Sequence, residues 1–172
     1  YGYPVEEMDV LGIKSTAKFG YGNTLPILVA QNAANTEVLF LDFEKRNGFD
    51  GITNSNAHSG QSALNFNLNK SYVFADNYMI SSDMINKNGL GIKVWVRSEL
   101  NVPGNQGIKN DNPQLKANIG GQLFNFKRIA QTGEWSLFQA EIKDFKGLSE
   151  GAYDIRFVYN FNTALSLSLI HI

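Results

Sequence analysis

The alternating segment from Ala63 to Asn69 constrains the fold more than any other part of the chain. From Leu64 onward apolar and polar residues alternate at every position, and a period of two residues is typical of a β-strand with one buried face. The pattern predicts that Leu64, Phe66 and Leu68 face a core. Because the segment follows a turn of small and polar residues, His58 to Ser62, we expect the strand to begin at this turn.

The same alternation recurs downstream. Ile92, Val94 and Val96 alternate with polar residues and are predicted to point inward. Further strands are expected in Leu115 to Ala130, as a hairpin around Gly120-Gly121, in Trp135 to Ile142, with Phe138, Ala140 and Ile142 on one side, and in Tyr153 to Tyr159. Short strands separated by turns at regular spacing indicate an all-β, antiparallel sandwich rather than βαβ units.

The N-terminal part has a different pattern. Tyr1 to Gly12 predicts a short strand and a turn, and Tyr21 to Pro26 is a second cluster of turn residues. Residues 27–36 are expected to form a short helical connector, because Ala and Gln favour helices. We therefore divide the chain into a segment and linker, residues 1–36, and a sandwich domain, residues 37–165.

Residues 166–172 are expected to be a non-native tail. Leu167 to Ile172 resembles the translation of a transposon adapter used in DNA sequencing libraries, and the chain begins at Tyr1 rather than at Met. A native apolar last strand is the alternative, because the Leu/Ser alternation is typical of a strand. On the adapter interpretation the tail packs poorly, and His171 has no chemical role.

Composition narrows the class of function. A chain of 172 residues can hold one domain with a real core and a short appendage. The formal net charge of -1 gives no electrostatic case for nucleic acid or for an anionic membrane surface. No apolar run is long enough to cross a bilayer, so no membrane insertion is expected. The absence of Cys excludes disulfides, thiolate zinc sites and Cys nucleophiles.

The N-terminal part resembles the end of an RHS (YD-repeat) array. Tyr1, Gly2, Asp9 and Gly12 lie near the positions of that family's Tyr, Gly, Asp and Gly, although the first spacing is shortened. The stretch from Phe19 to Pro26, followed by Asn32-Ala33, is similar to the junction between repeats and the next domain in large surface proteins of Bacteroidetes. The resemblance implies an extracellular or cell-surface location, with the remainder of the parent repeat protein as a partner.

Residues from about Glu37 to Thr163 resemble the galactose-binding-like jelly roll of many carbohydrate-binding modules. The matching marks are Phe43-Glu44, the run from His58 to Leu64, Val94-Trp95-Val96, and the run from Thr132 to Trp135. This resemblance implies a jelly-roll β-sandwich that recognises carbohydrate without catalysis. The family's closing strand carries an acidic pair, which this chain lacks.

Few residues are available for catalysis. With His171 set aside, His58 is the one imidazole around which a Ser/His/Asp triad could form, and a structural role in its turn is the stronger interpretation. Asp42 and Glu44 are two positions apart and would share one face of a strand. Two carboxylates on one strand cannot bracket a sugar from both sides, as glycoside hydrolysis requires. We therefore expect no enzyme activity.

The jelly-roll resemblance also implies a structural Ca²⁺ site. In that family a Glu at the Phe-Glu position and nearby loop carbonyls often hold the ion, which here points to Glu44 with Asp50. Oxygen ligands of this kind suit Ca²⁺. The alternative is that both carboxylates are solvated at a strand end, so calcium is not a certain cofactor.

Trp95 is the leading candidate for ligand binding. If Val94 and Val96 point inward, Lys93, Trp95 and Arg97 share the opposite face, where an aromatic ring between two cations can stack on a pyranose. The alternative is that a loop or the preceding repeat covers Trp95, because large aromatic side chains are seldom bare. The two corresponding functions are glycan binding and a purely structural spacer or cap on the repeat array.

Overall fold

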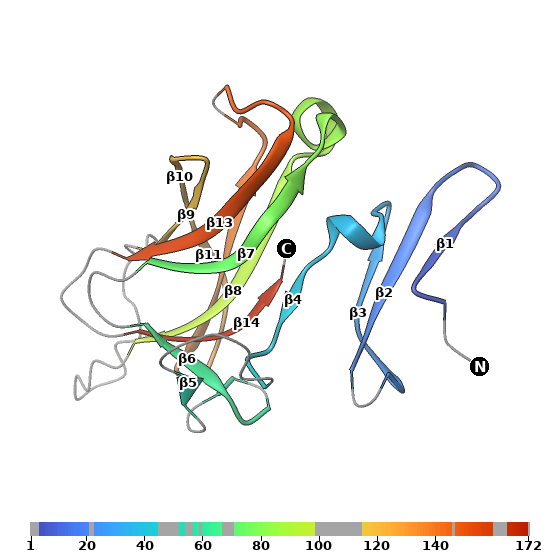
Figure 1. The fold of residues 1–172 in the computed structure, drawn as a ribbon. Coiled ribbons are helices and arrows are strands. Elements are labelled where there is room, and N and C mark those ends of the chain that lie inside the picture. The colour runs from blue at the N-terminus through green and yellow to red at the C-terminus, as the bar shows by residue number, and fades with distance from the viewer. Residues whose placement is uncertain are drawn as a thin grey trace. The chain divides into compact units, whose positions relative to one another are not determined.

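The computed structural model describes residues 4–20, 23–44, 52–53, 57–58, 60–66, 71–98, 115–145, 147–159 and 165–171. These residues form an all-β structure with three antiparallel sheets, drawn in Figure 1. The chain divides into two compact units, Tyr1–Phe40 with His171–Ile172 and Leu41–Ile170. The strand β4 (Phe40–Leu41) spans the boundary, which lies downstream of the boundary at residue 36 that the sequence predicts.

The N-terminal unit contains a three-stranded meander, in the order β1 (Glu6–Met8), β2 (Lys14–Gly20) and β3 (Leu25–Gln31). A 3-10 turn, η1 (Asn35–Glu37), follows. The predicted helical connector over residues 27–36 is therefore wrong. Val29 and Ala30 pair with Ala17 and Thr16 of β2, and these cross-strand bonds outweigh the weak helical preference of Ala and Gln.

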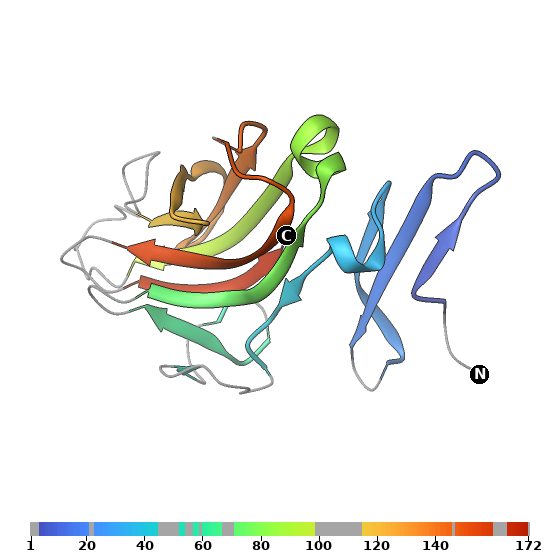
Figure 2. The ribbon, with the colours of Figure 1, turned by 45° about the horizontal axis from the view of Figure 1, so that its top comes forward.

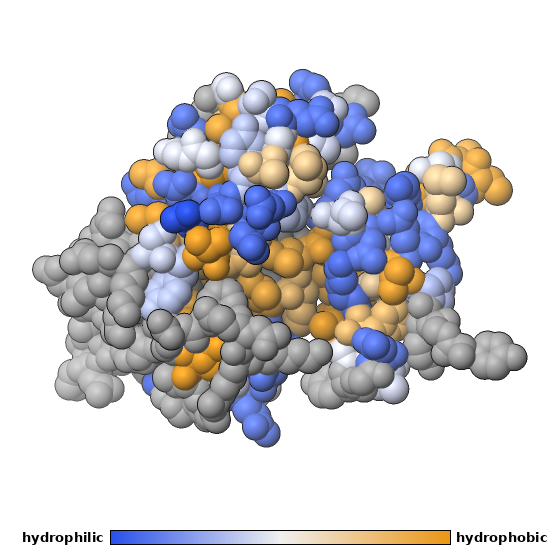
Figure 3. Space-filling model, in the orientation of Figure 1, coloured by the Kyte–Doolittle hydropathy of each residue, from blue (hydrophilic) through white to orange (hydrophobic). Residues whose placement is uncertain are grey.

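The turn between β1 and β2 is closed by Asp9. Its Oδ1 atom accepts hydrogen bonds from the amides of Leu11 and Ile13, at 2.8 and 2.9 Å. Met8, Val10 and Leu11 around this turn are exposed, and Figure 3 shows the apolar surface at the tip of the hairpin. The predicted strand and turn in the first residues are thus present, with the turn as the most exposed apolar part of the unit.

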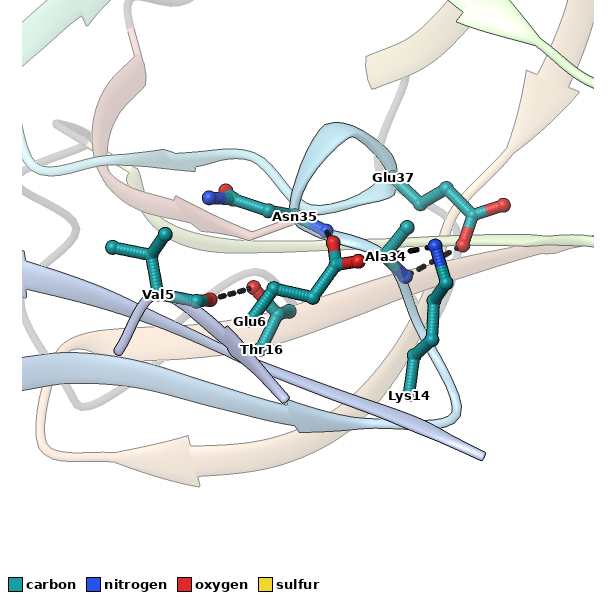
Figure 4. Close-up of polar contacts among 7 residues, drawn as sticks. All are labelled: Val5, Glu6, Lys14, Thr16, Ala34, Asn35 and Glu37. Carbon is teal, nitrogen blue, oxygen red and sulfur yellow. Dashed lines mark hydrogen bonds and ion pairs between the residues drawn. The ribbon is translucent and has the colours of Figure 1, made fainter. Parts of the chain in front are cut away.

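Polar contacts fix the start of β1, as Figure 4 shows. The Glu6 carboxylate accepts a hydrogen bond from the amide of Asn35 at 2.7 Å and lies 3.0 Å from Lys14 Nζ. These two contacts, the first being the stronger cause, hold the pKa of Glu6 below its usual value. The buried hydroxyl of Thr16 donates to the carbonyl oxygen of Val5 at 2.7 Å. This small sheet therefore buries a polar β-branched residue whose hydroxyl has a hydrogen-bond partner.

The second unit consists of two sheets, which Figures 1 and 2 show as two layers. The four-stranded sheet has the order β10 (Gln122–Asn125), β9 (Leu115–Ile119), β13 (Gly151–Tyr159), β7 (Ser71–Ile80). The larger sheet has the order β11 (Lys127–Thr132), β12 (Trp135–Ile142), β8 (Leu90–Ser98), β14 (Leu165–His171), β6 (Ala63–Phe66), β5 (Ile52–Thr53), with β4 paired to β14. A short π-helical turn, η2 (Met84–Asn88), connects β7 to β8. This arrangement confirms the antiparallel sandwich.

The core lies between the two sheets. Ile92, Val94 and Val96 are fully buried, as their alternation predicts. The other fully or almost fully buried side chains include Leu64, Leu115, Ile119, Phe138, Ala140, Ile142, Ile155 and Phe157. Two further positions are predicted to face the core: Leu68 lies outside the described residues, and the structure does not describe the side chain of Phe66. The alternating residues of both sheets thus supply one shared apolar layer.

Two glycines close the predicted hairpin. Gly120 and Gly121 join β9 to β10 and have φ values of 55° and 84°. A two-residue loop with positive φ at both positions matches the right-handed twist of the flanking strands, and glycine reaches this region without a steric penalty. The hairpin expected around this pair is confirmed.

The last strand includes most of the segment expected to be a non-native tail. The backbone of β14 pairs with β6 through Leu165, Ser166 and Leu167, which face Phe66, Asn65 and Leu64. The second unit extends to Ile170 rather than to residue 165. The strand-like Leu/Ser alternation therefore corresponds to a strand, and the adapter origin stays a prediction.

Candidate functional site

The outer face of the larger sheet brings together the three residues predicted to bind a ligand. Lys93, Trp95 and Arg97 alternate with the buried residues of β8, so they lie on the face away from the core. Lys93 is exposed, whereas Trp95 and Arg97 are partly exposed. Their direct neighbours on β12 are, in the same order, Gln139, Leu137 and Trp135. Side chains opposite one another in an antiparallel pair share a face, so these six residues form one surface.

An aromatic cluster lies at the centre of this face. The imidazole of His58 stacks on Trp95 with ring centroids 3.7 Å apart and an interplanar angle of 12°. It also meets Trp135 edge-on, at 5.9 Å and 80°. Burial lowers the pKa of His58 below its usual value, since the partly enclosed ring loses hydration when it is charged. His58 therefore covers one face of the Trp95 ring, and Trp135 is buried beside it.

Charged and amide groups surround the cluster. Arg97 Nε lies 3.1 Å from Glu134 Oε2, at the turn that precedes Trp135. On β12, Gln139 Nε2 donates to Glu141 Oε1 at 2.8 Å. Glu141 also lies 3.7 Å from Lys143 Nζ. The face thus presents an aromatic centre with hydrogen-bonding groups on both sides, which is an arrangement able to contact both the ring face and the hydroxyls of a sugar.

The expectation that Asp42 and Glu44 share one face of a strand is wrong. β4 ends at Leu41, and Phe43 has a positive φ of 61°, so the chain turns sharply between the two carboxylates. Asp42 Oδ1 accepts the amide of Glu44 at 3.1 Å, and this bond closes the turn. The buried ring of Phe43 anchors it to the core. Asp42 therefore stabilises a turn, and the two carboxylates do not form a pair on one strand face.

Glu44, the candidate calcium ligand, connects two loops. Its Oε1 atom accepts hydrogen bonds from the amides of Gln61 and Ser62, at 2.7 and 2.8 Å, just before β6 begins. This clamp accounts for the glycine at position 60, because a Cβ there would lie 2.3 Å from the same oxygen. Its proposed co-ligand Asp50 lies outside the described residues. Within the described part of the chain, no group of three His, Cys, Asp or Glu residues could hold a metal.

A hollow that the sequence does not predict lies on the outer face of the four-stranded sheet. It has a volume of about 550 Å³, and its lining includes Asn118, Tyr153, Asp154 and Arg156. Asp154 accepts a hydrogen bond from Arg156 at 2.8 Å and one from the amide of Asn77 at 3.3 Å, and these bonds, in that order, lower its pKa. The one sequence signal is the spacing of Asp154 and Arg156, two positions apart on a strand. Because Asp154 already binds the irregular backbone at Asn77, the hollow is shaped by structural contacts.

Comparison of the chain with protein-family models, with curated proteins and with solved structures finds no match. The sandwich architecture consequently rests on the structure itself. The jelly-roll and RHS resemblances remain predictions from the quoted sequence marks. Among the described residues, no helix is long and apolar enough to span a membrane.

Proposed function

We propose that this chain carries a non-catalytic, glycan-binding β-sandwich module of jelly-roll type. The observation that carries the proposal is the outer face of β8, where the partly exposed Trp95 lies between Lys93 and Arg97. The indole would contact the apolar face of a pyranose, and the cations would donate hydrogen bonds to hydroxyls. Because protein–hydroxyl bonds replace water bonds with little net gain, the stacking contact supplies a large share of the affinity.

His58 contributes to this function by holding the ring. A stacked aromatic neighbour restricts the rotation of Trp95, so less side-chain freedom is lost when a sugar binds. The exposed remainder of the indole is then the contact surface. Leu137, directly opposite Trp95 on β12, extends the apolar area beneath a sugar chain.

The sequence resemblances support the proposal that this module belongs to a large RHS-type protein at the bacterial cell surface or outside the cell. On this proposal the three-stranded N-terminal unit is the end of the repeat segment. The glycan and the remainder of the parent protein are the two partners. Enzyme activity is not part of the proposal, since His58 and Glu44 both have structural roles in the sandwich.

One observation favours the alternative function of a structural spacer. His58 already occupies one face of the Trp95 ring, and Trp135 at its side is buried. An aromatic cluster that satisfies itself can serve stability alone. On this interpretation the outer face has no ligand, and the sandwich only caps or spaces the repeat array.

Retention of the Trp95→Ala variant on immobilised polysaccharides separates the two functions. We expect the parent chain to be retained on at least one polysaccharide, the variant to lose retention at least tenfold, and both to give the same cooperative thermal transition. Trp95→Phe, which keeps a ring, should retain part of the binding, and Arg156→Ala, on the other sheet, all of it. A folded parent chain that binds no polysaccharide would establish the spacer. If Arg156→Ala loses binding and Trp95→Ala does not, the polysaccharide binds at the hollow on the four-stranded sheet and not at the outer face of β8.

A further inference from the structure

The charge pattern on the larger sheet identifies the class of glycan. We propose that the outer face binds an anionic polysaccharide, one that carries carboxylate or sulfate groups, in preference to a neutral one. This inference rests on the proposed glycan-binding function and specifies its ligand. It follows from a row of residues that crosses three neighbouring strands.

The row consists of Lys127, Gln139 and Lys93. Lys127 on β11 faces Gln139 on β12, and Gln139 in turn faces Lys93 on β8. All three side chains therefore share the outer face, with both lysines exposed and the amide between them partly exposed. Neighbouring strands lie about 4.8 Å apart, which puts the two lysine backbones roughly 10 Å from each other. That spacing approximates the length of a disaccharide unit.

Two described acidic groups of this face, Glu134 and Glu141, have cationic partners of their own. Glu134 pairs with Arg97, and Glu141 pairs with Lys143. Among the residues that the structure describes, no carboxylate lies within ion-pair distance of Lys93 or Lys127. Within the described part of the chain these two positive charges are therefore uncompensated, and on this proposal the ligand meets them directly.

This positive charge is local. The chain as a whole has a formal net charge of -1, so the lysine row does not reflect a generally basic protein. A local row of this kind attracts an anionic polymer to one face, and the attraction is screened by salt. The row also borders the apolar pair of Leu137 and Trp95, which lies two positions after Lys93 on β8 and two positions before Gln139 on β12. A polymer across this face therefore meets cations beside a stacking surface.

A nucleic acid is the other polymer with anionic groups and rings that stack. The observations favour a polysaccharide, since unspecific binding of single strands uses a groove lined with cations and several aromatic platforms. Here one partly exposed indole, already stacked on His58, accompanies two exposed lysines. Single-stranded DNA is accordingly included in the test as the competing ligand.

Polygalacturonate and its fully methyl-esterified form provide a matched pair of probes, because they share one sugar backbone and differ in the carboxylate charge. Binding of the full chain is measured on both, at low and at high salt. We expect the chain to bind the acid at least tenfold more tightly than the ester at low salt. This preference for the acid should disappear at high salt. The double variant Lys93→Gln/Lys127→Gln should lose at least fivefold on the acid. The control Lys116→Gln, on the four-stranded sheet, should lose none.

The outcomes separate this inference from the proposed function. Equal binding of acid and ester, abolished by Trp95→Ala and unaffected by the lysine variant, would overturn the anionic preference and keep the glycan function. Binding of neither polysaccharide, together with none to a sulfated one such as carrageenan, would overturn both. Tighter binding to single-stranded DNA than to either acid would identify a nucleic-acid surface and contradict the inference.

Discussion

His58 and Trp95 lie face to face, with their ring centroids 3.7 Å apart and their planes 12° from parallel. The two residues come from distant parts of the chain, a turn before β6 and the middle of β8. Their stack joins this turn to the outer face of the sheet. The stability of the stack depends on the charge of the imidazole, because burial disfavours the imidazolium form.

The first prediction concerns pH. The pKa of His58 is lower in the folded chain than its ordinary value of 6.5, so the unfolded chain binds the proton more readily. The stability that His58 contributes is therefore complete above that ordinary value and is lost as the pH falls through the lower folded-state pKa. Thermal unfolding from pH 8 downward should show this loss in the parent chain and not in His58→Phe, which keeps an aromatic ring without a charge.

Acidic side chains give a separate control for this measurement. The pKa values of Glu6 and Asp154 are both lowered by hydrogen bonds, so their contributions are lost only further into the acid range, below about pH 4.5. Both proteins should share this second loss. Equal pH profiles of the parent chain and His58→Phe between pH 8 and 5 would show that the stack does not depend on the charge of His58.

The second prediction concerns the Glu44 clamp. Its Oε1 atom accepts two amide hydrogen bonds from the turn before β6, and hydrogen bonds to charged groups contribute about 1.5–3 kcal/mol each at most. Because the clamp is partly solvated, we expect Glu44→Ala to lower the free energy of unfolding by about 1–3 kcal/mol in urea titrations. Glu134→Ala, which removes a partly exposed ion pair, should cost about 1 kcal/mol or less. Equal costs would mean that the clamp does not organise the turn.

Calcium tests the other role expected for Glu44. A site that binds Ca²⁺ only in the folded state raises the unfolding temperature with ion concentration. Because two amide donors already point at Glu44 Oε1, we expect no such rise in millimolar Ca²⁺ and no fall in EGTA. A calcium-dependent rise that both Glu44→Gln and Asp50→Asn abolish would instead confirm the calcium site that the sequence implies.

The third prediction compares the two glycines of the β9–β10 hairpin. A Cβ at Gly120 would lie 2.7 Å from Leu148 Cδ2 and 3.0 Å from the Tyr153 ring, whereas one at Gly121 would meet nothing within 4 Å. Both have positive φ, which costs a non-glycine residue roughly 1–2 kcal/mol. We expect Gly121→Ala to lose about that amount and Gly120→Ala about 2–4 kcal/mol, since overpacking adds to strain. Gly91→Ala, in open space on β8, should change stability by less than about 0.5 kcal/mol.

Local periodicity explains how much of the fold could be predicted. Ile92, Val94 and Val96 alternate without interruption, and the same pattern that buries them exposes Lys93. The period therefore also identified the outer-face residues. β3 was missed because its conformation depends on a partner: the cross-strand bonds to β2 decide it, and no pattern inside residues 27–36 contains them.

Contacts between distant segments explain what could not be predicted at the site. The stack of His58 on Trp95 requires the turn before β6 to lie over β8, which no spacing in the sequence encodes. The clamp of Glu44 on Gln61 and Ser62 depends in the same way on the sharp turn at Phe43. The sequence marks both residues as candidates for chemistry, whereas the structure gives His58 a stacking contact and Glu44 two amide hydrogen bonds.

The fourth prediction concerns the core. The alternation predicts that Phe66 is buried, but the structure does not describe its side chain. Phe157 therefore provides the test of the core. Phe157 is fully buried and packs against Phe74 and Phe126, with ring centroids 4.2 and 5.6 Å away. Truncation of a buried Phe to Ala removes apolar contacts and leaves a cavity, at a cost of about 3–5 kcal/mol. Urea unfolding of Phe157→Ala should show a loss in this range.

Met79→Ala is the matched control for Phe157→Ala. Met79 lies on β7, the strand that pairs with β13, and 53% of its surface is exposed. Its truncation should change the free energy of unfolding by less than about 0.5 kcal/mol, as for most surface positions. A loss below about 1 kcal/mol in Phe157→Ala would contradict the assignment of Phe157 to the layer between the two sheets. Both variants truncate one apolar side chain in the four-stranded sheet, so a large difference between them reflects the burial and the ring contacts of Phe157.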